Sequence, residues 1–256
     1  MKERSLHSGS QGPFRADQLR SGDPYELSNG HPRQCLPTGA RGAKAASVGD
    51  GVLASDPAVA DVGVDAGFSP SPETLRAPDL AVGEIPDQPG WVQGAPALAV
   101  EYADTGQDEV DLQVKIQELF AAGTRFVWVV RLTGPRRVEV HQAGQRMSIA
   151  HPGEDLEAPG ILANPVPVEA LYDREAARQV ILRNLLQRQG YASLDEVRSE
   201  GLREAVAEVL TARGLEVNDE LLAALAKSSD PVVLRSLLRQ AATAVSAAEI
   251  LISLRD

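Results

Sequence analysis

Two acidic residues interrupt apolar segments of this chain, and their spacing suits metal chemistry. Asp79 lies in "LRAPDLAVG" (75–83) and Glu101 lies in "APALAVEYA" (95–103). Burying a lone charge is costly, so each carboxylate needs a partner. Two carboxylates brought together in a sheet repel each other unless a cation lies between them, and hard divalent ions such as magnesium take such oxygen ligands. The alternative is that both acids face solvent at the edge of a sheet.

A lysine in the following segment is a third candidate. Lys115 lies in a stretch with helical spacing, and Asp111 and Leu119, one turn before and after it, share its face. A helix packed on the sheet could direct Lys115 toward the two carboxylates. An ammonium group there can stabilise charge on a phosphate or on a metal-bound water. The alternative is an ordinary solvated lysine.

These residues must be positioned by strands. "VADVGVDAGFS" (59–69) alternates apolar and polar residues, which predicts a half-buried strand. "LRAPDLAV" (75–82) and "APALAVEYA" predict the next two strands, and a Pro/Gly-rich loop joins them. "RFVWVVRL" (125–132) and "RRVEVHQ" (136–142) predict two more strands. The Asp79 and Glu101 strands are consecutive, so we expect them to be neighbours with their carboxylates close together.

A helix is predicted between the Glu101 strand and the later strands. "TGQDEVDLQVKIQELFAAG" (105–123) ends at a glycine suited to a helix C-terminus. Its predicted buried positions are Val110, Val114, Ile116, Leu119 and Phe120. Lys115 would border this stripe. Strands and helix together indicate an α/β core.

The pattern changes after Pro165, where helices follow one another. We expect about five short helices over residues 165–256, because capping residues recur there. The predicted caps are Ser193, Asn218, Asp230 and Ser246. The helical extension could bind a partner or could be a packed cap on the core.

Composition limits the possible classes. The chain has 256 residues, of which 43% are hydrophobic, and its net charge of −11 argues against broad nonspecific attraction to nucleic acid. A single cysteine, Cys35, excludes an intrachain disulfide framework and, with four histidines, leaves no zinc-like cluster. No apolar stretch has membrane-spanning length, and the first residues lack a signal-peptide pattern. We therefore expect a cytoplasmic protein.

Four segments resemble the Uma-type restriction endonucleases, a bacterial branch of the PD-(D/E)XK nuclease superfamily. They are "YELSNG" (25–30), "APD" (77–79), "VEYA" (100–103) and "DLQVKIQELFAAGTRFVWVV" (111–130). The last segment is the most specific of the four. The resemblance runs from about Tyr25 to His141 and suggests a nuclease-like domain at 23–160. Composition without periodicity predicts a flexible leader at 1–22, and the helical pattern predicts the extension at 165–256.

The resemblance implies a restriction-endonuclease-like mixed sheet flanked by helices, in which Asp79 and Glu101 chelate magnesium or manganese. The superfamily lysine usually lies two residues after the glutamate, where this chain has Ala103. The resemblance therefore implies that Lys115 takes its role from the helix. Glu26 corresponds to an acidic residue near the N-terminus that faces the same site.

Two functions remain open at this point. The first is a metal-dependent endonuclease that hydrolyses DNA phosphodiester bonds; such enzymes commonly work as homodimers when they cut both strands. The second is a catalytically degenerate nuclease fold that acts as a binding or scaffolding module through its helical tail. Departures from the family pattern at His31-Pro32, Asp104 and Leu119 favour the second.

Overall fold

The computed structural model describes residues 12–254 and divides into two compact units between Leu185 and Leu186. The helices of the first part of the chain are η1 (Ala16–Gln18), α1 (Ala40–Ser55), α2 (Glu109–Ala122), η2 (Val168–Leu171) and α3 (Arg174–Arg188). Its strands are β1 (Tyr25–Ser28), β2 (His31–Gln34), β3 (Val62–Val64), β4 (Phe68–Ser71), β5 (Thr74–Arg76), β6 (Leu80–Val82), β7 (Val92–Gln93), β8 (Leu98–Ala103), β9 (Phe126–Arg131), β10 (Arg137–Gln142), β11 (Ser148–Ala150), β12 (Asp155–Leu156) and β13 (Val166–Pro167).

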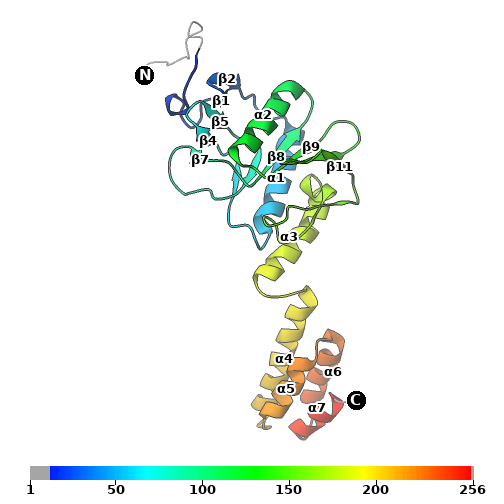
Figure 1. Cartoon of the computed structure of the whole chain (residues 1–256). Coiled ribbons are helices and arrows are strands. Elements are labelled where there is room, and N and C mark those ends of the chain that lie inside the picture. Colours follow the sequence, from blue (N-terminus) through cyan, green and yellow to red (C-terminus); the bar gives the residue numbers. More distant parts are fainter. Residues whose placement is uncertain (1–11, 255–256) are drawn as a thin grey trace. The chain divides into compact units, whose positions relative to one another are not determined.

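Two mixed sheets form the first unit (Figure 1). The six-stranded sheet has the order β11-β10-β9-β8-β6-β3, in which only β8 and β9 are parallel. The five-stranded sheet has the order β2-β1-β5-β4-β7. This arrangement, with helices packed on the sheet, confirms the predicted α/β fold class of a mixed sheet flanked by helices.

Helices α1 and α2 pack against opposite faces of β8, because side chains alternate between the two faces of a strand. Val100 and its alternate neighbours on β8 join the core that contains α1. Ala99 and Ala103 instead pack with α2. Glu101 has the same parity as these two alanines, so it projects toward α2. The small alanine side chains leave room for a helix to approach the sheet closely.

The segment "LRAPDLAV" is two strands, and the prediction of one strand is wrong. β5 ends at Arg76 and belongs to the five-stranded sheet, whereas β6 begins at Leu80 in the six-stranded sheet. Pro78 lies in the break, because proline has no backbone N–H to donate to a ladder. Asp79 therefore lies at the crossover between the two sheets, immediately before β6. The period-two pattern at 59–69 is likewise split, into β3 and β4.

The buried stripe of α2 also differs from the prediction. Val110 is 76% exposed, whereas Leu112, Ile116 and Leu119 are buried. Lys115 is itself buried within this stripe. The sequence predicted a buried Val110 and a Lys115 at the border of the stripe. Apolar periodicity cannot show that a helix face covers a buried polar site.

The N-terminal leader is partly ordered. Residues 1–11 of the predicted leader lie outside the described residues. Ala16 and Leu19, however, are buried in a small cluster with Leu27 and Leu75. The indole N–H of Trp91 donates to the Ala16 carbonyl at 2.9 Å. The part of the leader that the structure describes thus packs on the five-stranded sheet.

The second unit is helical and has its own core. It contains α4 (Leu194–Ala212), α5 (Asp219–Lys227), α6 (Pro231–Ala241) and α7 (Ala247–Ser253). Nine apolar side chains of these helices and of Ala244 form one buried cluster. The predicted N-caps Ser193, Asn218 and Asp230 each accept a backbone N–H, whereas Ser246 makes no such bond.

The extension expected at 165–256 is not purely helical at its start. β13 pairs with β12 in a two-stranded sheet of its own. Val168, Leu171 and Val180 join the core of the six-stranded sheet, because apolar residues of η2 and α3 complete its α1 face. Between residues 12 and 254, no helix combines the length and hydropathy needed to cross a membrane.

Gly49 of α1 provides a first testable prediction, because a Cβ there would overlap the hydroxyl of Tyr102. That hydroxyl donates to the Leu171 carbonyl at 3.0 Å. Gly49→Ala is expected to lower the free energy of unfolding by about 1–3 kcal/mol through overpacking. The control is Gly51→Ala in the same helix, where a Cβ would meet the Ile181 Cδ1 atom at 3.3 Å, the mobile end of a side chain. Equal losses in thermal denaturation of the two variants would contradict this prediction.

Candidate functional site

Asp79 lies next to Glu101 because β6 and β8 are antiparallel neighbours with Leu80 opposite Val100. Because the two strands run antiparallel, the next pair of residues in this register is Asp79 and Glu101. The backbone N–H of Tyr102 donates to Asp79 Oδ2 at 2.6 Å, which fixes the carboxylate. Burial raises the pKa of Asp79, and the charge of Lys115 opposes this effect. We refer to Asp79 and Glu101 as the carboxylate pair.

Glu101 is buried on the face of β8 that α2 covers. Its Oε1 atom lies 2.7 Å from Lys115 Nζ. Burial raises the pKa of Glu101 to about 8, because Lys115 only partly offsets the loss of water and Asp79 adds a nearby negative charge. A carboxylate in this position would be stabilised by further positive charge.

Lys115 is held by three acceptors. Besides Glu101, its Nζ atom lies 3.0 Å from Glu26 Oε1 and donates to the Ala77 carbonyl at 2.8 Å. The break in the strand at Pro78 leaves that carbonyl free for the lysine. Burial favours the neutral amine, but Glu101 and Glu26 outweigh it and raise the pKa of Lys115 above its ordinary value. Lys115 is therefore a fixed positive charge beside the carboxylate pair.

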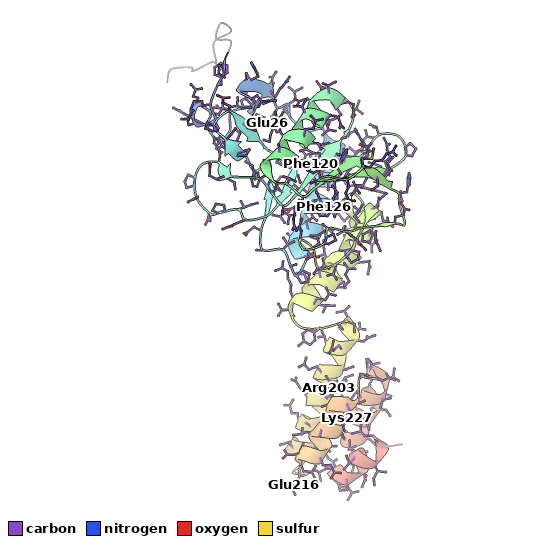
Figure 2. All side chains as sticks on the ribbon, in the orientation of Figure 1. Glu26, Phe120, Phe126, Arg203, Glu216 and Lys227 are labelled. Atoms are coloured by element: carbon purple, nitrogen blue, oxygen red, sulfur yellow. The ribbon has the colours of Figure 1, made fainter. Side chains whose placement is uncertain are left out.

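Glu26, labelled in Figure 2, lies on β1 and uses both carboxylate oxygens. Oε1 accepts from the Ala77 N–H at 3.2 Å and contacts Lys115, while Oε2 accepts from Arg76 Nη1 at 2.8 Å. Burial raises the pKa of Glu26, but Lys115 and Arg76 outweigh burial, so the net shift is downward. These contacts fit a residue that holds Lys115 in place.

Two members of this cluster were not identified from the sequence. Arg76 on β5 lies between Glu26 and Glu118, and its Nε atom donates to Glu118 Oε2 at 2.5 Å. Glu118 follows Lys115 by nearly one helical turn, so the spacing in "KIQE" could have indicated that they share a face. Arg76 gave no such signal, because it lies in an apolar stretch that was interpreted as one strand.

The cluster carries more negative than positive charge. Its four carboxylates belong to Glu26, Asp79, Glu101 and Glu118, and its two cations are Lys115 and Arg76. With all four carboxylates ionised, two negative charges remain, and the raised pKa values of Asp79 and Glu101 show that this excess is unfavourable at the carboxylate pair, where a proton or a cation relieves it. A divalent ion would balance it.

The donor set fits magnesium or manganese in kind. Carboxylate oxygens are hard ligands, and such ions commonly complete their coordination with water and backbone carbonyls. Across residues 12–254, no three His, Cys, Asp or Glu side chains form a metal-binding group. An ion at the carboxylate pair would thus take its other ligands from water and the backbone.

An open cleft of about 530 Å³ borders the cluster. Its charged lining consists of Asp23, Glu26, Arg33, Asp65, Asp79, Glu101, Asp111 and Lys115. A second hollow of about 280 Å³ also reaches Asp65 and Asp79 and runs along small side chains of α1. Asp79 is therefore reachable from both hollows.

The three departures from the family pattern lie in different surroundings. Asp104 pairs with Arg41 of α1, whose Nε atom donates to it at 2.9 Å, and this bond lowers the pKa of Asp104 to about 2. His31 and Pro32 lie on the exposed strand β2. Leu119 is part of the α2 core.

Cys35 opens onto the cleft but is a weak nucleophile. Loss of water around the thiol, together with the negative charge of Glu26, raises the pKa of Cys35 to about 11. Because the thiolate is the reactive form, alkylation by iodoacetamide should accelerate with pH up to about 11. The measurement is the alkylation rate by mass spectrometry, with a cysteine peptide as control. A rate that levels off together with the peptide near pH ~8.5 would contradict this prediction.

Comparisons with known proteins show the family and the fold of the chain. The family model Uma2, described as "Putative restriction endonuclease", matches residues 15–168. No curated protein matches the chain. A crystal structure of a putative nuclease of family DUF820 from Anabaena variabilis is similar, with a TM-score of 0.52 and 17% sequence identity. The similarity covers 64% of this chain and 99% of that chain, and at this identity it supports the fold alone.

Proposed function

The chain belongs to the Uma2 family, whose model is described as "Putative restriction endonuclease", and from this premise we propose that it is a metal-dependent endonuclease that hydrolyses DNA phosphodiester bonds. In this proposal, Asp79 and Glu101 hold Mg²⁺ or Mn²⁺, and Lys115 and Glu26 complete the site. The observation that carries it is the buried carboxylate pair, whose pKa values are both raised, beside a fixed lysine.

The proposed chemistry divides among the residues as follows. A bound divalent ion supplies a water of lowered pKa and offsets charge on the phosphate. Lys115 adds a positive charge on the α2 side, and exchange of its Ala77 bond would let it donate to a phosphate oxygen or to the attacking water. Glu26 holds the lysine in position through Oε1.

The strongly acidic cleft supports a metal requirement for substrate entry. Two cationic side chains line the cleft, those of Lys115 and Arg33. Arg33 already forms an ion pair with Asp111 at 3.3 Å. Phosphate groups are repelled by such a lining unless cations neutralise it. We include a homodimer in the proposal, because a second copy would supply the second site needed to cut both strands of a duplex.

Plasmid and single-stranded DNA cleavage test this proposal. We expect wild type to cut with magnesium or manganese, to stop with EDTA and to recover when the metal is restored. Sedimentation velocity with and without DNA reports the oligomeric state. If wild type leaves every DNA substrate intact in both metals, the degenerate binding module replaces the nuclease as the favoured function.

A further inference from the structure

We infer that Arg76 and Glu118 are positioning residues that fix Lys115 of the proposed nuclease site through Glu26. This inference rests on the proposed function for its kinetic test, and it concerns residues that neither the family pattern nor the sequence identified. The contacts run in alternating charge from Glu118 to Arg76, then to Glu26, Lys115 and Glu101. We call this series the buried ion chain.

Arg76 is the central member of the buried ion chain. It is 1% exposed, a rare state for arginine because removing a guanidinium from water costs much free energy. Nη1 donates to Glu26 Oε2 at 2.8 Å and Nε donates to Glu118 Oε2 at 2.5 Å. One planar group thus hydrogen-bonds two carboxylates from different elements, and its Nη2 atom also lies 3.9 Å from Asp111 Oδ1 of α2. A lysine would hold the two carboxylates less rigidly, because the donors of its single nitrogen lack the planar fork geometry.

Glu118 anchors the far end of the chain to the β1–β2 hairpin. Its Oε1 atom accepts from the Ser28 hydroxyl at 2.6 Å and from Asn29 Nδ2 at 3.4 Å. Glu118 and Lys115 both belong to α2, while Glu26 belongs to β1 and Arg76 to β5. The buried ion chain therefore joins the part of α2 that carries Lys115 to strands β1 and β5.

Stability alone is a poor explanation for this arrangement. Well-packed apolar residues are often as stabilising as a buried ion pair, or more so. Lys115 has a long flexible stem, and its ammonium can help a reaction only if it stays at the carboxylate pair. Arg76 occupies Glu26 Oε2, which turns Oε1 toward Lys115. Fixing Glu26 in this way orients the lysine.

The test is Arg76→Met, with Arg131→Met as the matched control. Arg131 on β9 is 9% exposed and also joins two carboxylates, of Glu139 at 2.8 Å and Glu109 at 2.6 Å. It does not line the cleft. Both variants should lose stability, as breaking a buried ion pair does. Assayed well below both melting temperatures, only Arg76→Met should lower kcat, by about 10- to 100-fold, because a small misplacement of a reacting group costs this much.

Two further readouts separate a positioning role from a structural one. KM for DNA and the affinity for manganese should stay at wild-type values in Arg76→Met, because the carboxylate pair is untouched. Arg76→Lys should recover only part of kcat. If Arg76→Met does not fold, Glu118→Gln keeps the side-chain volume and should lower kcat by about tenfold, as loss of a charged hydrogen-bond partner does. Wild-type kcat in Arg76→Met, or in Glu118→Gln where it is the variant used, would overturn the inference.

Crystal structures of the variants test this inference without any measurement of activity, and so independently of the proposed function. In wild type, Lys115 Nζ lies 2.7 Å from Glu101 Oε1. We expect this contact to be lost or disordered in Arg76→Met and retained in Arg131→Met. Absence of cleavage by wild type would refute the proposed function, and these structures would then decide the inference. An unchanged lysine in Arg76→Met would refute it.

Discussion

Asp79→Asn is expected to lower magnesium-dependent DNA cleavage on the order of 1,000-fold, because stabilisation of a transition state by a bound metal is worth several kcal/mol. The substitution removes one negative charge from the carboxylate pair but keeps an oxygen that can accept from Tyr102 N–H. The fold should therefore survive, and thermal denaturation checks that it does. Manganese affinity, measured by calorimetry, should fall together with activity.

The control for Asp79→Asn is Asp65→Asn. Asp65 lines the same cleft and has a left-handed backbone, with φ of 51°, which asparagine tolerates. The substitution lowers the negative charge of the cleft by the same amount, keeps both carboxylates of the pair, and leaves the backbone N–H of residue 65 to donate to the Asp79 carbonyl at 3.3 Å. A much smaller loss of cleavage is expected. If both variants lose cleavage equally, general charge in the cleft rather than a metal ligand at Asp79 explains the activity.

Lys115→Met is expected to lower cleavage by ~100-fold or more, the range for removing one preorganised charge-stabilising group. Methionine has a similar length and packs in the α2 core but can neither donate to a phosphate nor offset its charge. The ammonium contacts Glu101 and Glu26 and donates to the Ala77 carbonyl, so its removal leaves these buried acceptors without that donor. The free energy of unfolding should fall by about 3–5 kcal/mol, or by less if Glu101 becomes protonated.

The control for Lys115→Met is Lys44→Met on the exposed part of α1. It removes the same formal charge at the surface and should change neither stability nor cleavage. Cleavage is measured below the melting temperature of both variants. If Lys115→Met cuts DNA as fast as wild type, the role of the helix lysine is wrong, whatever its effect on stability.

Much of the site's framework could be predicted from local sequence patterns. Two acids in apolar segments indicated neighbouring strands, and the structure brings Asp79 and Glu101 together across β6 and β8. The helix ending at Gly123 was also predictable, because a left-handed glycine, here with φ of 112°, is typical of a helix C-terminus. These features depend on residues close together in the chain.

The remainder depends on contacts between distant residues. Arg76 meets Glu26 and Glu118 because three elements converge, and no spacing in the sequence encodes that convergence. Pro78 marked a break that alternation alone concealed. The burial of Lys115 in the α2 stripe required knowing that Glu101 lies beneath it. The positions of Arg76 and Lys115 thus depend on ion pairs with residues distant in the sequence, which periodicity does not reveal.

The most direct measurement of the proposed metal site is anomalous diffraction from a wild-type crystal soaked in manganese. One strong peak is expected, with oxygen atoms of both Asp79 and Glu101 about 2.1 Å from it, as for a small divalent ion. The same soak of Asp79→Asn should show a weak peak or none. A wild-type crystal at saturating manganese with no peak there, or with its only peak away from both carboxylates, would contradict the proposed site.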